Sequence, residues 1–262
     1  MSKTLIEIKN LTKSYVSNKK DITCALKSVS LGIKQGEIMG LLGVNGAGKT
    51  TLSSILATLH PPTSGDIIWN GQSIYKDIIS YRKILGFCPQ KPNLDKVLTI
   101  EENLYFSGTY FGLTKEDVRE RVNVLIEKLS LSSYRKSSAD ILSGGYKQRF
   151  LIARSLMHHP KFVILDEPTV GLDAHIRRQL WQVILELKKE GVTILLTTHY
   201  LDEAEYLSDR VCFINEGKIY TVDTPENLKK KYKKNSLEEV FLQFLDDSQS
   251  KLFQKLENTN ET

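Results

Sequence analysis

The strongest constraint on this chain is a glycine-rich loop at residues 43–50, with the sequence Gly-Val-Asn-Gly-Ala-Gly-Lys-Thr. It fits the phosphate-binding pattern G-x-x-x-x-G-K-[ST], which arises by chance in a chain of this length on the order of once in a hundred. A nearly solid apolar run at 37–42 precedes the loop, and a helix-forming run at 49–57 follows it. Strand, loop and helix in this order are the context that the motif requires. The loop therefore predicts a nucleotide site rather than a flexible turn.

The chemistry of this loop predicts how each part would bind phosphate. Its glycines allow backbone amides to turn inward and form an anion nest at the N-terminus of the next helix, where the helix dipole also favours phosphate. Lys49 would reach the β and γ phosphates, and the Thr50 hydroxyl would bind Mg²⁺. The residues that we expect to line the nucleotide are Gly43, Asn45, Gly46, Ala47, Gly48, Lys49, Thr50 and Thr51.

A second motif, Leu142-Ser143-Gly144-Gly145-Tyr146-Lys147-Gln148-Arg149, lies farther along the chain. Ser143 would cap a helix whose N-terminus forms another phosphate nest with Gly144 and Gly145. The apolar run 162–165 follows and ends in Asp166-Glu167. At the carboxyl edge of a sheet, Asp166 would hold Mg²⁺ through water and Glu167 would deprotonate an attacking water. An Asp-Glu pair alone is more often a helix start or a solvated turn.

Hydrophobic periodicity predicts an α/β fold with a mostly parallel sheet core, an antiparallel β subdomain and an inserted helical subdomain. Residues 4–9 and 28–34 alternate as half-exposed strands do, and 37–42 indicates a central strand. Thr99 and Thr114 are expected to cap two helices of the insertion. We expect an ATPase domain at 4–224, with the helical subdomain inserted at about 91–158. A C-terminal helical extension and tail would occupy 225–262.

Composition narrows the classes of function. No run approaches the eighteen or so apolar residues of a membrane span, and the N-terminus lacks the apolar core of a secretion signal, so we expect a cytoplasmic location. The three cysteines (Cys24, Cys88 and Cys212) lack metal-binding spacing. The net charge of +5 is densest at Lys229–Lys234, which predicts a solvated helix face or, alternatively, contact with anionic lipid. The basic residues lack interleaved aromatics, so nucleic-acid binding is not expected.

A further motif, Asn18-Lys19-Lys20-Asp21, fits the N-K-x-D pattern by which GTPases read guanine. In those proteins it follows the phosphate-binding loop or is separated from it by a longer βα unit. Here it precedes the loop closely, so a polar turn is the better interpretation.

With these motifs in this order, residues 4 to about 224 resemble the ATP-binding subunits of ABC transporters, which are P-loop NTPases. The resemblance implies ATP and Mg²⁺ as ligands. It matches Gln90 to the family's glutamine loop, which binds the metal and links the active site to a membrane partner. It matches His199 to the switch histidine that contacts the γ-phosphate, and Tyr15 to the aromatic residue that stacks on adenine.

The resemblance also implies a dimer that sandwiches ATP. Ser143, Gly144 and Gly145 match the signature loop that contacts ATP bound by a second subunit, and Asp173 matches the loop that crosses the dimer interface. The family's commonest signature has Gln where this chain has Tyr146. The sequence resembles the branch that exports drugs or antibiotics through a separate transmembrane permease, which would place the chain on the cytoplasmic face of the membrane. The alternative is an assembly or regulatory ATPase of the same fold without a permease.

For the permease contact, we expect a groove near Gln90 and Glu101–Tyr110 that receives a short cytoplasmic helix of the partner. The apolar and aromatic residues of this segment are Leu104, Tyr105, Phe106 and Tyr110. Each could instead pack inside the helical subdomain.

Overall fold

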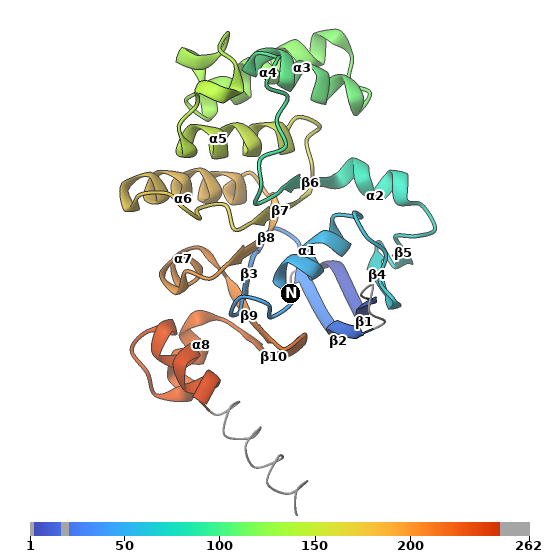
Figure 1. Cartoon of the computed structure of the whole chain (residues 1–262), viewed down its shortest axis with the longest axis vertical. Helices are drawn as coiled ribbons and strands as arrows, with labels where there is room; N and C mark the ends of the chain where they lie inside the picture. The colour runs from blue at the N-terminus through green and yellow to red at the C-terminus, as the bar shows by residue number, and fades with distance from the viewer. Residues whose placement is uncertain (1–2, 17–20, 247–262) are drawn as a thin grey trace, which may run out of the picture.

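The computed structural model of this chain describes residues 3–16 and 21–246, which form two β-sheets surrounded by helices (Figure 1). Most of the N-K-x-D pattern and the C-terminal tail from residue 247 lie outside the described residues. The antiparallel sheet has the order β2 (Ile22–Lys34), β1 (Thr4–Val16), β4 (Ser64–Trp69) and β5 (Gln72–Ser73). The larger sheet has the order β10 (Lys218–Asp223), β9 (Arg210–Asn215), β3 (Ile38–Leu42), β8 (Thr193–Thr198), β7 (Phe162–Asp166) and β6 (Leu85–Cys88).

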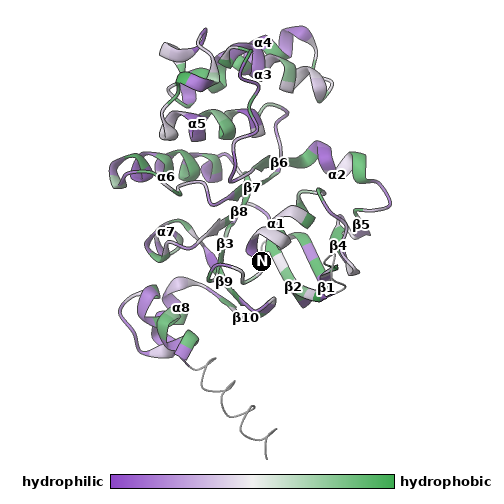
Figure 2. Cartoon of the chain, in the orientation of Figure 1, coloured by the Kyte–Doolittle hydropathy of each residue, from purple (hydrophilic) through white to green (hydrophobic). Residues whose placement is uncertain are grey.

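The larger sheet is parallel except at β10, which pairs antiparallel with β9. Strand β3 lies between β8 and β9 and is buried along its whole length, as its apolar run predicts. Alternate residues of β7 enter two different cores: Val163 and Leu165 face the helical side, whereas Phe162 and Ile164 face α1 and the antiparallel sheet. Figure 2 shows the apolar residues concentrated in these central strands. Burial on both faces explains why their sequences are solid rather than alternating.

The helices are α1 (Lys49–Leu56), α2 (Ile78–Ile84), α3 (Ile100–Tyr110), α4 (Lys115–Lys128), α5 (Gly144–Ser155), α6 (Ala174–Lys189), α7 (Leu201–Leu207) and α8 (Pro225–Tyr232), with short 3-10 turns at Ser132–Tyr134 and Ala139–Ile141. Helices α3, α4 and α5 gather at one end of the molecule (Figure 1). Thr99 and Glu102 form a capping box at the start of α3, and Thr114 accepts a bond from the Asp117 N–H at the start of α4. The apolar side of α4, made of Val118, Val122, Leu125 and Ile126, is buried.

The C-terminal segment packs on the end of the larger sheet farthest from α3 and α4 (Figure 1). Residues 237–246 are helical and place Val240 and Phe241 in a small core with Phe213 of β9. In the basic run, Lys229 pairs with Glu205, their Nζ and Oε1 atoms 2.5 Å apart, and Lys230 and Lys231 are exposed.

The structure confirms the predicted fold class, while the predicted domain boundaries stay predictions. The strands of the antiparallel sheet are longer than the alternation at 4–9 and 28–34 indicated. The pairing of β1 with β2 shifts register between Ile8 and Lys13, and Asn10 and Ser28 have positive φ angles of 47° and 55°. Such irregularities break the two-residue period that sequence analysis relies on. Among the described helices, none is long and apolar enough to span a membrane.

Candidate nucleotide site

The glycine-rich loop connects β3 to α1 and adopts a conformation that its glycines allow. Gly46 and Gly48 have φ angles of 81° and 111°, which residues with a side chain rarely adopt. A Cβ atom on Gly43 would lie 2.3 Å from the carbonyl oxygen of Ile214. Because Gly48 occupies the N-cap of α1, the free N–H groups of the helix open into the loop. The predicted anion nest is therefore sterically compatible with this backbone.

Lys49 lies inside the loop, with 4% of its side chain exposed. Its Nζ donates to the carbonyl oxygens of Gly43, at 2.8 Å, and Val44, at 3.3 Å. The same Nζ lies 3.5 Å from Oε1 of Glu167. The ammonium group is thus held at the centre of the loop by neutral carbonyls and by a carboxylate from another strand.

The two acids at the end of β7 have different environments. Asp166 is the last residue of the strand, and burial raises the pKa of its carboxyl group. Its Oδ1 accepts a 2.6 Å bond from the Thr197 hydroxyl, whose oxygen in turn accepts the N–H of Glu167 at 2.9 Å. Glu167 has a φ of 49°, so the chain turns sharply just after the strand. This turn separates the two carboxylates and directs Glu167 towards the loop.

The Glu167 carboxylate is the centre of a cluster of predicted site residues. Gln90, after β6, donates from Nε2 to Oε2 of Glu167 at 2.9 Å. His199, after β8, places Nδ1 3.5 Å from the same oxygen. With Lys49, these residues come from the carboxyl ends of four different strands, where open α/β sheets bind their ligands. The structure thus brings together Lys49, Gln90, Glu167 and His199, and their roles stay predictions.

The signature loop lies apart from this cluster. A Cβ atom on Gly144 would lie 3.4 Å from Leu172, so the signature loop adjoins the segment that leads to Asp173. Among residues 3–16 and 21–246, no hydrogen bond or ion pair joins Ser143 or Asp173 to the Lys49 cluster.

One expectation about this loop is wrong. Ser143 occupies the N-cap position of α5, but its side chain makes no capping bond. The cap position depends on backbone angles, whereas the bond also requires a rotamer that points the hydroxyl at the helix amides. Asp173 at the start of α6 likewise makes no side-chain cap bond. Tyr146 is half-buried against Tyr134, with ring centroids 4.6 Å apart.

Tyr15 lies on β1 with 42% of its surface exposed. The Lys13 ammonium approaches its ring, 5.2 Å from the centroid. One face of the ring therefore has a cation nearby, and the exposed surface leaves room for a stacked base.

Comparison with known proteins decides the family. The model of the ABC transporter family matches residues 26–170, more than half of the 262 residues. The chain belongs to the ABC transporter family. The matched region includes the residues predicted to form the phosphate-binding loop, the glutamine loop and the signature, together with the Asp166-Glu167 pair, and the chain carries the family's ATPase domain.

Three relatives illustrate the match. The linearmycin resistance ATP-binding protein LnrL of Bacillus subtilis (strain 168) is 37% identical over 224 residues, which are 86% of this chain and 70% of that protein. ATP-binding cassette sub-family A member 17 of Rattus norvegicus is 40% identical over 87% of this chain, which spans only 13% of that longer protein. A solved dimeric ATP-binding cassette, in a post-hydrolysis state with ADP and Pi, is 28% identical with a TM-score of 0.77, covering 84% of this chain and 98% of that one.

Sequence analysis did not identify the residues whose hydrogen bonds hold the site residues of this ABC domain in place. Thr197 bonds to both acids, and the only signal for it was a polar residue near the end of an apolar strand. Helix α5 holds the glutamine loop on both sides of Gln90. Gln148 donates to the Cys88 sulfur at 3.3 Å, and Arg154 donates to the Asn93 carbonyl oxygen at 2.7 Å. The signature helix and the glutamine loop are therefore joined within one chain.

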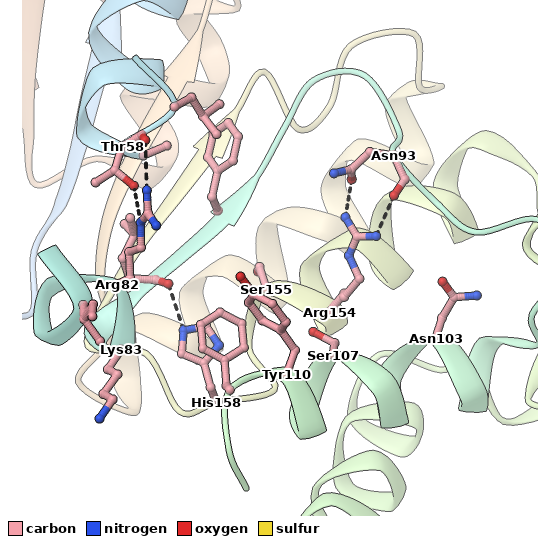
Figure 3. Close-up of a pocket in the computed structure, with 16 residues that line it drawn as sticks. Thr58, Arg82, Lys83, Asn93, Asn103, Ser107, Tyr110, Arg154, Ser155 and His158 are labelled. Carbon is pink, nitrogen blue, oxygen red and sulfur yellow. Dashed lines mark hydrogen bonds between the residues drawn. The ribbon is translucent and has the colours of Figure 1, made fainter. Parts of the chain in front are cut away.

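A groove of about 800 Å³ lies beside the glutamine loop of this ABC chain (Figure 3). Of the segment predicted to line it, Asn103, Ser107 and Tyr110 do so, whereas Leu104 is buried in the core and Gln90 is not part of the wall. The complete lining is Ala57, Thr58, Leu59, Ile79, Arg82, Lys83, Leu85, Phe87, Asn93, Asn103, Ser107, Tyr110, Phe111, Arg154, Ser155 and His158.

His158 forms part of the groove wall as a neutral ring. It stacks on Phe111 with centroids 3.7 Å apart, and its Nε2 lies 2.8 Å from the Leu85 carbonyl oxygen. Burial lowers the pKa of His158 to about 4, although the bond to the Leu85 carbonyl oxygen acts in the opposite direction. The groove therefore presents a neutral histidine at physiological pH.

Proposed function

We propose that this chain is the ATP-hydrolysing subunit of an ABC transporter, working as a dimer around two ATP molecules and driving a membrane permease. The observation that supports this most is the convergence of Lys49, Gln90 and His199 on the Glu167 carboxylate at the carboxyl edge of the sheet. A buried base beside a cationic phosphate loop is the arrangement that phosphoryl transfer to water requires.

In this proposal Glu167 orients a water molecule and takes one of its protons as the water oxygen attacks the γ-phosphorus of ATP. The bond between that phosphorus and the β–γ bridging oxygen breaks, which gives ADP and inorganic phosphate. Lys49 and the loop amides stabilise charge on the phosphate oxygens, and His199 contacts the γ-phosphate. Tyr15 stacks on adenine.

The residues near the loop fit a magnesium ion. The Asp166 carboxylate, the Thr50 hydroxyl and the Gln90 amide oxygen are all oxygen donors, and Mg²⁺ is usually held by one or two carboxylates together with water and substrate phosphates. When bound, Mg²⁺ would neutralise charge on the β and γ phosphates.

Dimerisation would complete the site. The signature residues of one chain lie away from its own Lys49 cluster, and the structural relative described above was solved as a dimer. In the dimer, Ser143, Gly144 and Gly145 of one subunit would contact the ATP held by the other, and Asp173 would cross the interface.

A mixing experiment tests this sandwich. Lys49→Ala damages the loop and Ser143→Arg damages the signature, so each variant alone should be inactive. A mixed dimer has one doubly damaged site and one intact site, and the expected result is partial recovery of ATP hydrolysis. Heterodimers that form on mixing and remain inactive would contradict the sandwich.

The groove supports the further step of this proposal, a permease that inserts a cytoplasmic helix there. This would place the chain on the cytoplasmic face of the membrane, and the resistance protein LnrL favours a drug or antibiotic exporter. Cysteine pairs between position 107 and the short cytoplasmic helices of a candidate permease should crosslink with yields that depend on ATP. A fully active transporter without any crosslink along the groove would contradict the docking. Purification without any membrane protein would favour the assembly or regulatory ATPase instead.

A further inference from the structure

Glu203 of α7 is a buried acid that the site described above does not use. Its side chain is fully buried, and its Oε1 accepts a 2.8 Å bond from the indole N–H of Trp181 on α6. No salt bridge between described residues includes Glu203. Burial raises the pKa of its carboxyl group, and the neighbouring Asp202 carboxylate raises it further. An isolated buried carboxylate is far costlier than a neutral carboxyl group, so the neutral form is favoured.

Two threonine side chains lie beside this carboxyl group. Thr198 and Thr169 are both buried, and hydrogen bonding to each lowers the pKa of Glu203, against the larger effect of burial. Oε2 of Glu203 and Oγ1 of Thr169 are nevertheless buried without a well-aligned hydrogen bond in the described part of the chain. A neutral carboxyl group can donate a proton and a threonine hydroxyl can accept it. A small rotation that joins the two atoms would therefore satisfy both, which burial makes favourable.

Each threonine adjoins a residue of the nucleotide cluster. Thr198 directly precedes His199, and its Oγ1 accepts an N–H from the turn before α7 at 3.0 Å. Thr169 lies two residues after Glu167, and its carbonyl oxygen accepts an N–H from the turn towards α6 at 3.2 Å. Glu203 therefore lies where the turn that carries His199 meets the turn that follows Glu167.

We propose that Glu203 is a positioning residue for ATP hydrolysis, which fixes the turn of His199 relative to the turn after Glu167 and anchors both to α6 through Trp181. It acts through the two threonines rather than on the nucleotide. The inference rests on the roles proposed for Glu167 and His199, whose side chains lie 3.5 Å apart. Displacements of about 1 Å between reacting groups can cost about 10²-fold in rate. Lys49 makes no printed bond to Glu203 among the residues described, so we expect an effect on kcat rather than on KM.

Steady-state hydrolysis of ATP by the purified full-length protein tests this role. Glu203→Gln keeps the shape, an acceptor for Trp181 and a donor for Thr169, whereas Glu203→Leu keeps only the approximate volume. Thr169→Val removes the hydroxyl on the other side of the contact. Glu205→Leu, the same change two residues along α7, is the matched control, because Glu205 pairs with Lys229 of α8. Urea unfolding measures the stability of each variant separately.

We expect Glu203→Leu to lower kcat by about tenfold or more with little change in KM, and Glu203→Gln to restore about the wild-type rate. Thr169→Val should lower kcat by a smaller factor. Adding Thr169→Val to Glu203→Leu should slow hydrolysis no further, because both changes remove the same contact. Glu205→Leu should hydrolyse ATP as the wild type does, whatever its stability.

Three results would overturn the inference. The first is a wild-type kcat in folded Glu203→Leu while Glu167→Gln is slow, which would make Glu203 purely structural and leave the proposed function standing. The second is a Glu203→Gln variant as slow as Glu203→Leu. The third is a wild-type kcat in Thr169→Val, which decides the question if Glu203→Leu does not fold. If Glu167→Gln itself hydrolyses ATP at the wild-type rate, the proposed catalytic role fails and the inference fails with it.

Discussion

Charged side chains have different partners in the cluster around Glu167 and in the groove beside the glutamine loop. In the cluster, the Lys49 ammonium lies 3.5 Å from a carboxylate of the same chain, and the Glu167 carboxylate also has Gln90 and His199 beside it. In the groove, Arg82 and Arg154 hydrogen-bond to neutral groups, and Lys83 lies near Asp77, whose pKa is lowered mainly by its bonds from Ser80 and further by the charge of Lys83. A hydrolytic site needs its groups positioned before the substrate arrives, whereas a recognition surface can leave its charge for the partner to neutralise.

The two regions are nevertheless connected through α5. This helix begins at the signature and bonds to the glutamine loop through Gln148 and Arg154, and Arg154 also forms part of the groove wall. An occupant that shifts Arg154 would therefore act on the loop that carries Gln90. The contrast between the two regions can be tested one residue at a time.

Glu167→Gln should have the largest effect because it removes the carboxylate on which Lys49, Gln90 and His199 converge. We expect the hydrolysis rate to fall by about 10²- to 10⁴-fold while ATP binding persists. The amide keeps the shape of the side chain but accepts no proton. Phosphate release measures the rate, and size-exclusion chromatography with ATP should reveal a long-lived dimer. Glu190→Gln, at an exposed acid after α6, is the control. Hydrolysis at the wild-type rate in Glu167→Gln would show that Glu167 is not the general base.

His158, in the wall of the groove, should make the free energy of unfolding depend on pH. The folded state holds its pKa near 4, below the ordinary value of 6.5, so the unfolded chain binds more protons between these values. Stability is therefore full above about pH 6.5 and is lost as the pH falls towards 4. The loss is about 2 kcal/mol by pH 5 and about 3 kcal/mol below pH 4.

Urea unfolding of the wild type and of His158→Gln, at pH 7 and pH 5, measures this contribution. The variant should lose about 2 kcal/mol less than the wild type between the two pH values, because it carries no titrating ring. His60→Gln, at an exposed histidine, should follow the wild type. Parallel curves for wild type and His158→Gln would mean that the ring is not buried as a neutral group.

Tyr15→Ala tests whether an exposed aromatic side chain on β1 contributes to ATP binding. If Tyr15 stacks on adenine, its loss should weaken ATP binding by about 1–3 kcal/mol, as base stacking does in other proteins. Tyr15→Phe keeps the ring and should bind ATP as the wild type does. Dissociation constants from isothermal titration measure both. Equal affinity in Tyr15→Ala would return this residue to the solvated surface of β1.

The sequence predicted most of the nucleotide cluster because its residues follow apolar strands in recognisable motifs. Strand, loop and helix around Lys49, and the acids that end β7, follow from local patterns. The contacts of Thr197 and of Gln148 could not be predicted, because they join segments 31 and 60 residues apart that no spacing rule relates. The charge of the groove was likewise hidden, since its walls come from α2, α3, α5, β6 and the residues that follow α1, which meet only in the folded chain.

The smallest expected effect comes from Tyr110→Ala, which asks whether the groove wall contributes to the fold at all. Tyr110 is 86% exposed, so its truncation should change the free energy of unfolding by no more than about 0.5 kcal/mol. Leu104, on the same helix, is fully buried, and Leu104→Ala should cost about 2–5 kcal/mol. Urea unfolding of the two variants gives a matched comparison within α3. A cost near 2 kcal/mol for Tyr110→Ala would mean that its ring packs inside the helical subdomain, and the groove would lose its most exposed apolar wall.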